Sequence, residues 1–184
     1  MNYIKITKND VANGPGVRCV LWVAGCNLHC GGCHNQSTWD FNAGRPFDEN
    51  AKQELFDILD KPYIQGLTIS GGHPLDQHNI EDVLGLVKEV KSKFPTKDIW
   101  LYTGYTFEEI CEMRCNVQIY NYLTNNKYKY NIWKNLEYVD VLVDGPYIDE
   151  QRDITLAFRG SKNQRLINIQ ESLRQGKIIT LQND

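Results

Sequence analysis

The sequence lacks the features that would tie the chain to a membrane or to a nucleic acid. Its longest apolar runs, such as Val20 to Ala24 and Val139 to Val143, are far shorter than the roughly 18 residues that suggest a membrane span. The first residues contain no apolar core of the kind found in a secretion signal. Acidic residues outnumber basic ones by 23 to 20, so the net charge is −3 and no strongly basic surface can hold a phosphate backbone. We therefore expect a cytoplasmic chain with neither a membrane nor a nucleic acid as its partner.

Linkers and internal repeats are also missing, so the 184 residues predict one compact domain. Two stretches stand apart within it. Residues 116–136 are rich in asparagine and tyrosine and are interpreted as an insertion, whereas 151–184 form a basic C-terminal segment whose charges suit a solvated face. In the reducing cytosol the six cysteines are better explained as ligands, nucleophiles or core residues than as a disulfide framework.

The apolar pattern alternates between strands and helices. It predicts strands at Val17 to Val23, Gly66 to Ser70, Asp98 to Tyr102 and Val139 to Val143, and helices after Asp48, at Ile80 to Phe94 and at Thr106 to Arg114. Such alternation requires crossover connections and predicts an α/β fold with a mainly parallel sheet. Sites in these sheets form beyond the carboxyl ends of the strands, where the sequence places a cysteine-rich loop, a double glycine, Thr103 and Asp144.

Three cysteines, Cys26, Cys30 and Cys33, lie within eight residues after the strand predicted at 17–23. A chain turning through such a loop can point all three sulfurs at one centre, and Gly31 and Gly32 permit the tight backbone that this requires. Three thiolates are one short of the four that close a structural zinc site or a four-iron cluster. The pattern therefore favours a metal centre with one corner open to a small molecule.

The cysteine pattern is also compatible with two different structures. A zinc site would be completed by His29, His34 or His73, and a weaker alternative is three unrelated core cysteines. Among the remaining thiols, Cys19 lies in a predicted strand and is expected in the core. Cys111 and Cys115 share one face of a predicted helix and are interpreted as incidental or buried thiols. Trp39 is also expected in the core.

The spacing C-x-x-x-C-x-x-C resembles the cluster motif of radical S-adenosylmethionine (SAM) enzymes. The segments Asn13 to Arg18, Cys33 to Asp40, Ile64 to Gly72, Asp98 to Tyr105, Val139 to Gly145 and Arg159 to Arg165 are similar to those of glycyl-radical activating enzymes in that family. Within it they are most similar to the branch that activates anaerobic ribonucleoside-triphosphate reductase. The resemblance runs from near the start of the chain to about Arg165 and leaves out the 116–136 stretch.

This resemblance implies a single radical SAM domain over residues 1–184, built as a partial (β/α) barrel. It implies a [4Fe-4S] cluster on the three loop cysteines and SAM bound by Asn35, Gly71, Gly72, His73, Thr103 and Asp144. No side chain is expected to be catalytic, because the cluster and SAM carry the chemistry, namely reductive cleavage of SAM and hydrogen abstraction from a glycine of a partner enzyme. The implied partners are the reductase large subunit and a one-electron donor such as flavodoxin or ferredoxin.

His73 departs from the family pattern, which has an acidic residue after the double glycine to hold the SAM ammonium. Neutral imidazole still accepts one hydrogen bond, whereas protonated imidazole repels a cation, so we expect weakened or pH-dependent SAM binding. The basic C-terminal segment, with Arg159 and Arg165, is a candidate docking surface for the partner.

Three further functions are weighed against this one. They are an activase of another glycyl-radical enzyme of the pyruvate formate-lyase type, a small-molecule radical enzyme of the deazaguanine type, and a non-catalytic zinc or iron-sulfur module. His73 is the best argument for the last.

Overall fold

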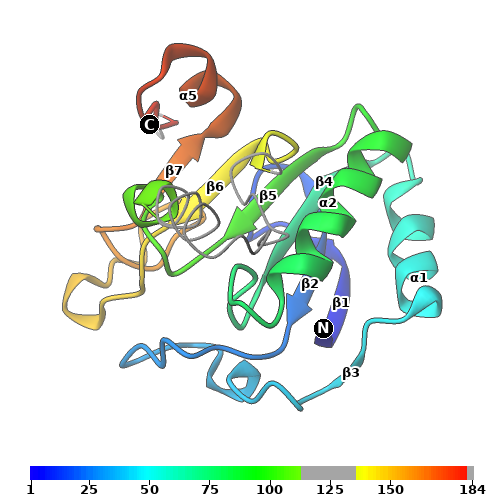
Figure 1. Cartoon of the computed structure of the whole chain (residues 1–184), viewed down its shortest axis with the longest axis horizontal. Coiled ribbons are helices and arrows are strands. Elements are labelled where there is room, and N and C mark those ends of the chain that lie inside the picture. The colour runs from blue at the N-terminus through cyan, green and yellow to red at the C-terminus, as the bar shows by residue number, and fades with distance from the viewer. Residues whose placement is uncertain (113–135, 182–184) are drawn as a thin grey trace, which may run out of the picture.

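The computed structural model describes residues 1–112 and 136–181. Its centre is a seven-stranded sheet in the order β3-β1-β2-β4-β5-β6-β7 (Figure 1). The strands are β1 (Asn2–Asp10), β2 (Val17–Val23), β3 (Arg45–Pro46), β4 (Ile64–Gly71), β5 (Asp98–Tyr102), β6 (Val141–Asp144) and β7 (Arg165–Asn168). The helices are α1 (Glu49–Leu59), α2 (Ile80–Lys93) and α5 (Ile169–Gln175), with a helical segment at 107–112 and the short 3-10 helices η1 (Gln36–Thr38) and η2 (Asp149–Gln151).

The four central strands β2, β4, β5 and β6 are parallel, as the sequence predicts, and their carboxyl ends meet at one edge of the sheet. The outer strands differ, because β1, β3 and β7 all pair in the antiparallel direction. Within the described part of the chain the sheet is open, with β3 and β7 at its two edges. The α/β class and the parallel centre are thus confirmed, and the sheet does not close into a barrel.

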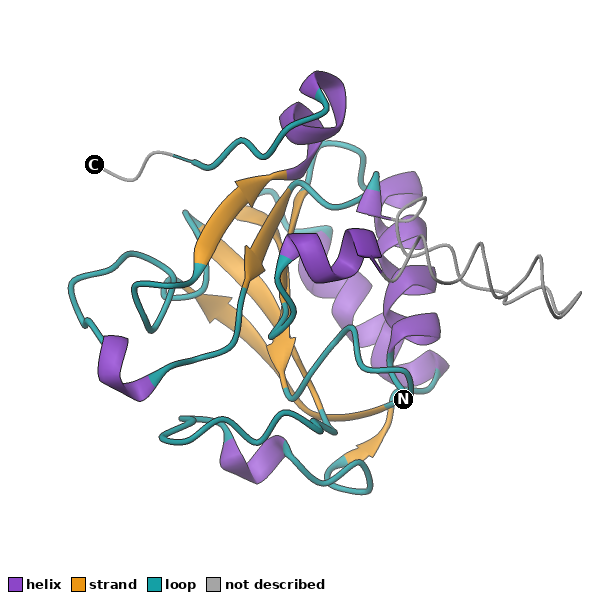
Figure 2. Ribbon diagram, turned by 60° about the vertical axis from the view of Figure 1, so that its left-hand side comes forward, coloured by secondary structure: helices purple, strands orange, loops and turns teal. Residues whose placement is uncertain are grey.

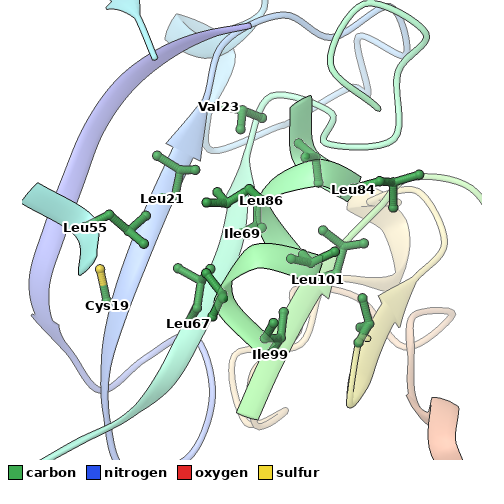
Figure 3. Close-up of a cluster of buried hydrophobic side chains, with 14 of the residues drawn as sticks. Cys19, Leu21, Val23, Leu55, Leu67, Ile69, Leu84, Leu86, Ile99 and Leu101 are labelled. Carbon is green, nitrogen blue, oxygen red and sulfur yellow. The ribbon is translucent and has the colours of Figure 1, made fainter. Parts of the chain in front are cut away.

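The helices α1 and α2 pack their apolar faces on one side of this sheet (Figure 2). Asp48 precedes helix α1, and its side chain accepts a hydrogen bond from the Ala51 amide at 2.9 Å and so caps the first turn. Its residues Leu55 and Leu59 are fully buried against the strands. Cys19 lies in the same core, as predicted (Figure 3), and burial raises its pKa to about 12.

The other face of the sheet is covered by the loop at 145–164 instead of by long helices (Figure 2). A smaller apolar cluster lies there, in which Trp100 packs edge-on against Phe158 with ring centroids 5.4 Å apart. The Tyr102 hydroxyl donates a hydrogen bond to the carbonyl oxygen of Phe158 at 2.6 Å. The loop is therefore held down over β5.

Arg18 closes the amino-terminal end of the parallel strands. It is fully buried, donates hydrogen bonds to Thr68 Oγ1 and the Leu67 carbonyl oxygen, and pairs with Asp98 at 2.7 Å. Its guanidinium also lies over the Trp100 ring. Arg18 thus has a structural role, at the end of the sheet opposite to the cysteine loop.

Some of the expectations fall outside the described residues. These are Cys115 and the proposed insertion at 116–136, of which only the buried Leu136 is described. In the part of the chain that is described, no helix combines the length and the apolar character needed to cross a bilayer.

Candidate metal and cofactor site

A pocket opens at the carboxyl ends of the parallel strands. Its lining comes from four separate places: the cysteine loop (residues 26–38) after β2, the turn after β4, the segment after β5 and the segment after β6. Lining residues include Cys26, Cys30, Cys33, Asn35, Gly71, Gly72, His73 and Thr103. All of the expected site residues except Asp144 therefore lie in one pocket.

The cysteine loop is closed at its neck by main-chain hydrogen bonds. The Gly25 amide donates to the Thr38 carbonyl oxygen at 2.7 Å, and the Cys26 amide donates to the Trp39 carbonyl oxygen at 3.0 Å. Gly25 has a φ of +93°, and a Cβ there would lie 2.0 Å from the Phe41 ring. Only glycine fits this point, where the strand turns into the loop.

The electrostatics of the loop favour a bound cation. Burial raises the pKa of the Cys26 thiol, hydrogen bonds from the Leu28 and His29 amides oppose the shift, and the neighbouring Cys30 and Cys33 raise it further. A positively charged metal centre at the three sulfurs would stabilise the thiolate form in which cysteine binds a metal. The Cys33 sulfur already accepts a hydrogen bond from the Asn35 amide at 3.3 Å, which is a common support for cluster sulfurs.

The donor set fits an iron-sulfur cluster better than a single zinc ion. Among the described residues, no three histidine, cysteine or acidic side chains converge on one ion. The histidines considered as a fourth ligand have other contacts: His29 stacks on Trp39, His34 meets Tyr147 edge-on, and His73 hydrogen-bonds Thr103. A [4Fe-4S] cluster takes one cysteine sulfur at each protein-bound corner, so three cysteines of one loop in one pocket wall match three of its corners.

His73 is almost fully buried in the pocket wall. Its Nε2 lies 2.9 Å from Thr103 Oγ1 and its ring meets Tyr105 edge-on. Its Nδ1 has no hydrogen-bond partner among the residues that the structure describes. Burial lowers its pKa to about 4, although the charge of Asp76 acts in the opposite direction. The imidazole is therefore neutral at neutral pH and presents one buried polar atom without a partner.

The double glycine lets the turn after β4 touch the start of the cysteine loop. A Cβ on Gly72 would lie 2.4 Å from the Gly25 carbonyl oxygen, and one on Gly71 would lie 2.6 Å from the Val23 carbonyl oxygen. Gly71 also has a φ of +107°. The close approach of the two backbone segments therefore requires glycine at both positions, and the ligand contact expected from the sequence is a second reason for them.

Comparison with known proteins gives a consistent assignment. Residues 12–167 match the family described as "4Fe-4S single cluster domain". The chain is 44% identical over 166 residues to the anaerobic ribonucleoside-triphosphate reductase-activating protein of Enterobacteria phage T4, an alignment that covers 90% of this chain and 93% of that protein. Proteins of the same name from Haemophilus influenzae and Escherichia coli K12 are 42% and 37% identical, and both alignments cover 89% of this chain and 96% of the relative. The chain belongs to this family of activating proteins.

Asp144 lies behind the pocket wall and does not line the pocket. It is fully buried, and its carboxylate accepts hydrogen bonds from the Phe107 amide at 2.8 Å and from Arg165 Nε at 3.0 Å. Arg165 also forms two hydrogen bonds to Glu108, at 2.9 and 2.6 Å. Both Asp144 oxygens are thus engaged within the protein, and the adjacent Gly145 lines the pocket instead.

The same contacts change the interpretation of Arg165 and Arg159. Arg165 is expected to face a partner from the sequence, yet it joins β7 to the end of β6 and to the 107–112 helix. Glu108 and then Asp144 raise the pKa of its guanidinium. Arg159 donates to the Gln164 carbonyl oxygen. These two arginines serve internal contacts, so they are poor probes of a docking surface.

Several residues that line the pocket are not predicted from the sequence. Trp39, expected in the core, forms part of the wall, as do Leu28, Tyr102, Tyr147 and Gln164. Gly104 packs closely against Leu28 in this wall, because a Cβ on Gly104 would lie 2.1 Å from Leu28 Cδ1. A signal for Tyr147 is present, since it follows β6 by a few residues and so lies beyond the carboxyl end of a parallel strand.

Proposed function

We propose that this chain activates the anaerobic ribonucleoside-triphosphate reductase by generating a glycyl radical in its large subunit. The observation that carries the proposal is the presence of Cys26, Cys30 and Cys33 in one pocket wall of a chain that matches a 4Fe-4S single cluster family and relatives named activating proteins. On receipt of one electron from a donor such as flavodoxin or ferredoxin, a bound cluster with SAM supplies cleavage of a carbon-sulfur bond and removal of a hydrogen atom from a glycine. Residues 1–184 then act as one radical SAM domain of the cytoplasm, with the open sheet serving as a partial barrel.

The chain's own residues hold and orient these groups. The three cysteines provide the sulfurs, and the Asn35 amide fixes the orientation of the Cys33 sulfur. His73 and Thr103 form a neutral polar wall beside the cluster loop. The Nδ1 atom of His73, which is buried without a partner among the described residues, becomes an acceptor for the ammonium of SAM once the imidazole turns toward the pocket. A neutral acceptor is weaker than a carboxylate, so the wall contributes orientation more than charge.

Part of the remaining lining is apolar. Trp39, Leu28 and Pro146 present apolar surface to the pocket. Tyr102 lies on the wall with its hydroxyl turned to the Phe158 carbonyl oxygen, and burial raises its pKa above the usual range, so it stays protonated. These side chains would lower the polarity around a cofactor held in the pocket.

Glycine suits this reaction because it has no side chain to block approach and because two flanking amides delocalise its radical. The reductase must therefore present a glycine loop at the pocket mouth. With Arg159 and Arg165 engaged internally, the exposed cations of the basic segment include Arg152 and Lys162. Reversing both charges to Glu should weaken binding to the reductase without slowing SAM cleavage, and equal loss of both would contradict this docking surface.

Anaerobic reconstitution tests the function directly. The reconstituted chain, SAM and a one-electron reductant should produce a glycyl radical in the reductase, observed by electron paramagnetic resonance. Cys33→Ala should abolish the signal together with cluster binding, whereas the matched variant Cys111→Ala, which changes a thiol outside the pocket, should retain both. A colourless zinc protein, or a cluster-loaded chain that leaves the reductase without a radical, would overturn the proposal.

A further inference from the structure

Asp76 is a buried carboxylate that the proposed reaction does not use. Only 2% of its surface is exposed. Its Oδ2 accepts a hydrogen bond from Asn27 Nδ2 at 2.9 Å, and its Oδ1 accepts one from the His78 amide at 3.0 Å and contacts His78 Nδ1 at 2.8 Å. Asn27 is the residue directly after Cys26, so this carboxylate is anchored to the first turn of the cysteine loop.

The turn that carries Asp76 is bonded to the same loop at further points. Asn79, also 2% exposed, donates from Nδ2 to the carbonyl oxygens of Ala24 at 2.9 Å and His73 at 3.1 Å. The His73 amide donates to the Gly25 carbonyl oxygen at 2.7 Å. These bonds hold the residues on both sides of Cys26 to the turn at 72–79, so the Asp76 carboxylate keeps a fixed place relative to the Cys26 sulfur.

The charge of Asp76 reaches the pocket. It opposes the burial that lowers the pKa of His73. It also adds to the burial that raises the pKa of Tyr105, a residue on which the Cys26 charge acts in the same direction. The carboxylate and the Cys26 sulfur thus act on one side chain that packs against His73 in the pocket wall, and little water lies around Asp76 to screen its field.

We propose that Asp76 is a positioning residue that tethers the Cys26 turn through Asn27 and lowers the reduction potential of the bound cluster with its buried negative charge. The inference rests on the proposed function only in taking Cys26, Cys30 and Cys33 as the cluster ligands. Adding an electron to a cluster beside a fixed negative charge is unfavourable, so the reduced cluster becomes a stronger electron donor. That property suits a site that must reduce a sulfonium, which is a poor electron acceptor.

His78 contacts this carboxylate from the solvent side. Its side chain is more than half exposed, and a carboxylate has no hydrogen to donate, so His78 Nδ1 carries the proton of the contact. Donation from Nδ1 fixes the orientation of the carboxylate. His78 is thereby an accessible position at which the charge of Asp76 can be changed from outside.

The test is the midpoint potential of the reconstituted full-length chain, measured by electron paramagnetic resonance in an anaerobic redox titration, together with iron and sulfide content. Asp76→Asn keeps an oxygen for the Asn27 amide and removes the charge, so it should bind the same iron and shift the midpoint to a more positive value. Glu89→Gln is the matched control, since it removes one charge from the exposed surface of α2, and it should leave the midpoint unchanged. Full iron content with an unchanged midpoint in Asp76→Asn would overturn the inference.

A second variant provides the test if Asp76→Asn does not bind the cluster. His78→Lys places a permanent cation beside the carboxylate at a solvent-accessible position and should shift the midpoint in the same positive direction. An unchanged midpoint in His78→Lys would then overturn the inference. Failure of the wild-type chain to assemble a [4Fe-4S] cluster is a different outcome, because it contradicts the proposed function itself.

Discussion

The Nε2 atom of His73 lies 2.9 Å from the Oγ1 atom of Thr103, and this pair joins the segments after β4 and β5 across the pocket wall. The Thr103 oxygen also accepts a hydrogen bond from the Tyr105 amide at 3.1 Å. Burial of this pair lowers the pKa of His73 to about 4. The repulsion that a protonated His73 would exert on a cofactor ammonium is therefore confined to acidic solution.

The buried imidazole should make stability depend on pH. The pKa of His73 falls from 6.5 in the unfolded chain to about 4 in the folded one, so its contribution is fully present above pH 6.5 and is lost as the pH falls toward 4. Relative to His73→Asn, the wild type should lose about 2 kcal/mol of unfolding free energy between about pH 7.5 and about pH 5. Denaturant unfolding of both metal-free proteins, followed by tryptophan fluorescence, measures this difference. A difference that stays constant with pH would show that the imidazole is not held neutral.

Restoring an acidic residue at position 73 should tighten SAM binding. A hydrogen bond to a charged group is worth about 1 kcal/mol more than one between neutral groups, so His73→Asp should lower the dissociation constant about fivefold. Equilibrium dialysis of SAM against the two cluster-loaded proteins provides the comparison. His73→Asn is the control for size, and it should bind no more tightly than the wild type. Equal affinities of the Asp variant and the wild type would disprove the contact.

The pair formed by the buried Asp144 and the partly exposed Arg165 should contribute to the free energy of unfolding. Arg165→Met leaves a fully buried carboxylate with the Phe107 amide as its main partner, and such an unpaired charge costs about 3 kcal/mol or more. Adding Asp144→Asn should recover part of the loss, because the buried charge is then gone. Glu108→Gln, which changes the exposed partner of Arg165, should cost less than about 1 kcal/mol. Urea unfolding of these proteins measures these terms, and a double variant no more stable than Arg165→Met would contradict the pairing.

Gly31 and Gly32 provide a matched comparison inside the cysteine loop. Gly32 has a φ of +72°, and a Cβ there would lie 2.6 Å from Asp149 Oδ1, whereas a Cβ on Gly31 would meet nothing within 4 Å. Gly32→Ala should therefore cost about 1–2 kcal/mol from the backbone conformation alone and reduce iron binding. Gly31→Ala should load iron normally. Iron content and thermal unfolding measure both effects, and equal behaviour of the two variants would contradict this geometry.

The central part of the fold can be predicted because its signals are local. Apolar runs identify β2, β4 and β5, and a capping Asp48 with helical spacing identifies α1. Strand β1 (Asn2–Asp10) is missed because it is partly exposed and carries polar residues along its length. The region of α5 is interpreted from the sequence only as a basic face, although Asn168 caps it by accepting from the Glu171 amide and Gly176 ends it in a left-handed conformation.

The site can be predicted only where sequence proximity or strand order carries the information. The three cysteines lie within one loop, and the rule for carboxyl ends of parallel strands brings His73 and Thr103 to the same place. The internal role of Asp144 is not visible in the sequence, since its partner Arg165 lies 21 residues further along the chain in an antiparallel strand that is not expected. The Asp76–Asn27 contact joins residues 49 apart and has no local signature.

The neck of the cysteine loop is made of peptide groups, through the bonds from Gly25 to Thr38 and from Cys26 to Trp39, and not of sulfur. Exposure to oxygen that strips the iron leaves these peptide contacts intact. A protein that has lost its cluster should therefore keep the cysteine loop folded, and it should bind new iron and sulfide once its thiols are reduced again. Loss of activity in air should then be reversible, because the cluster can be rebuilt on the same polypeptide.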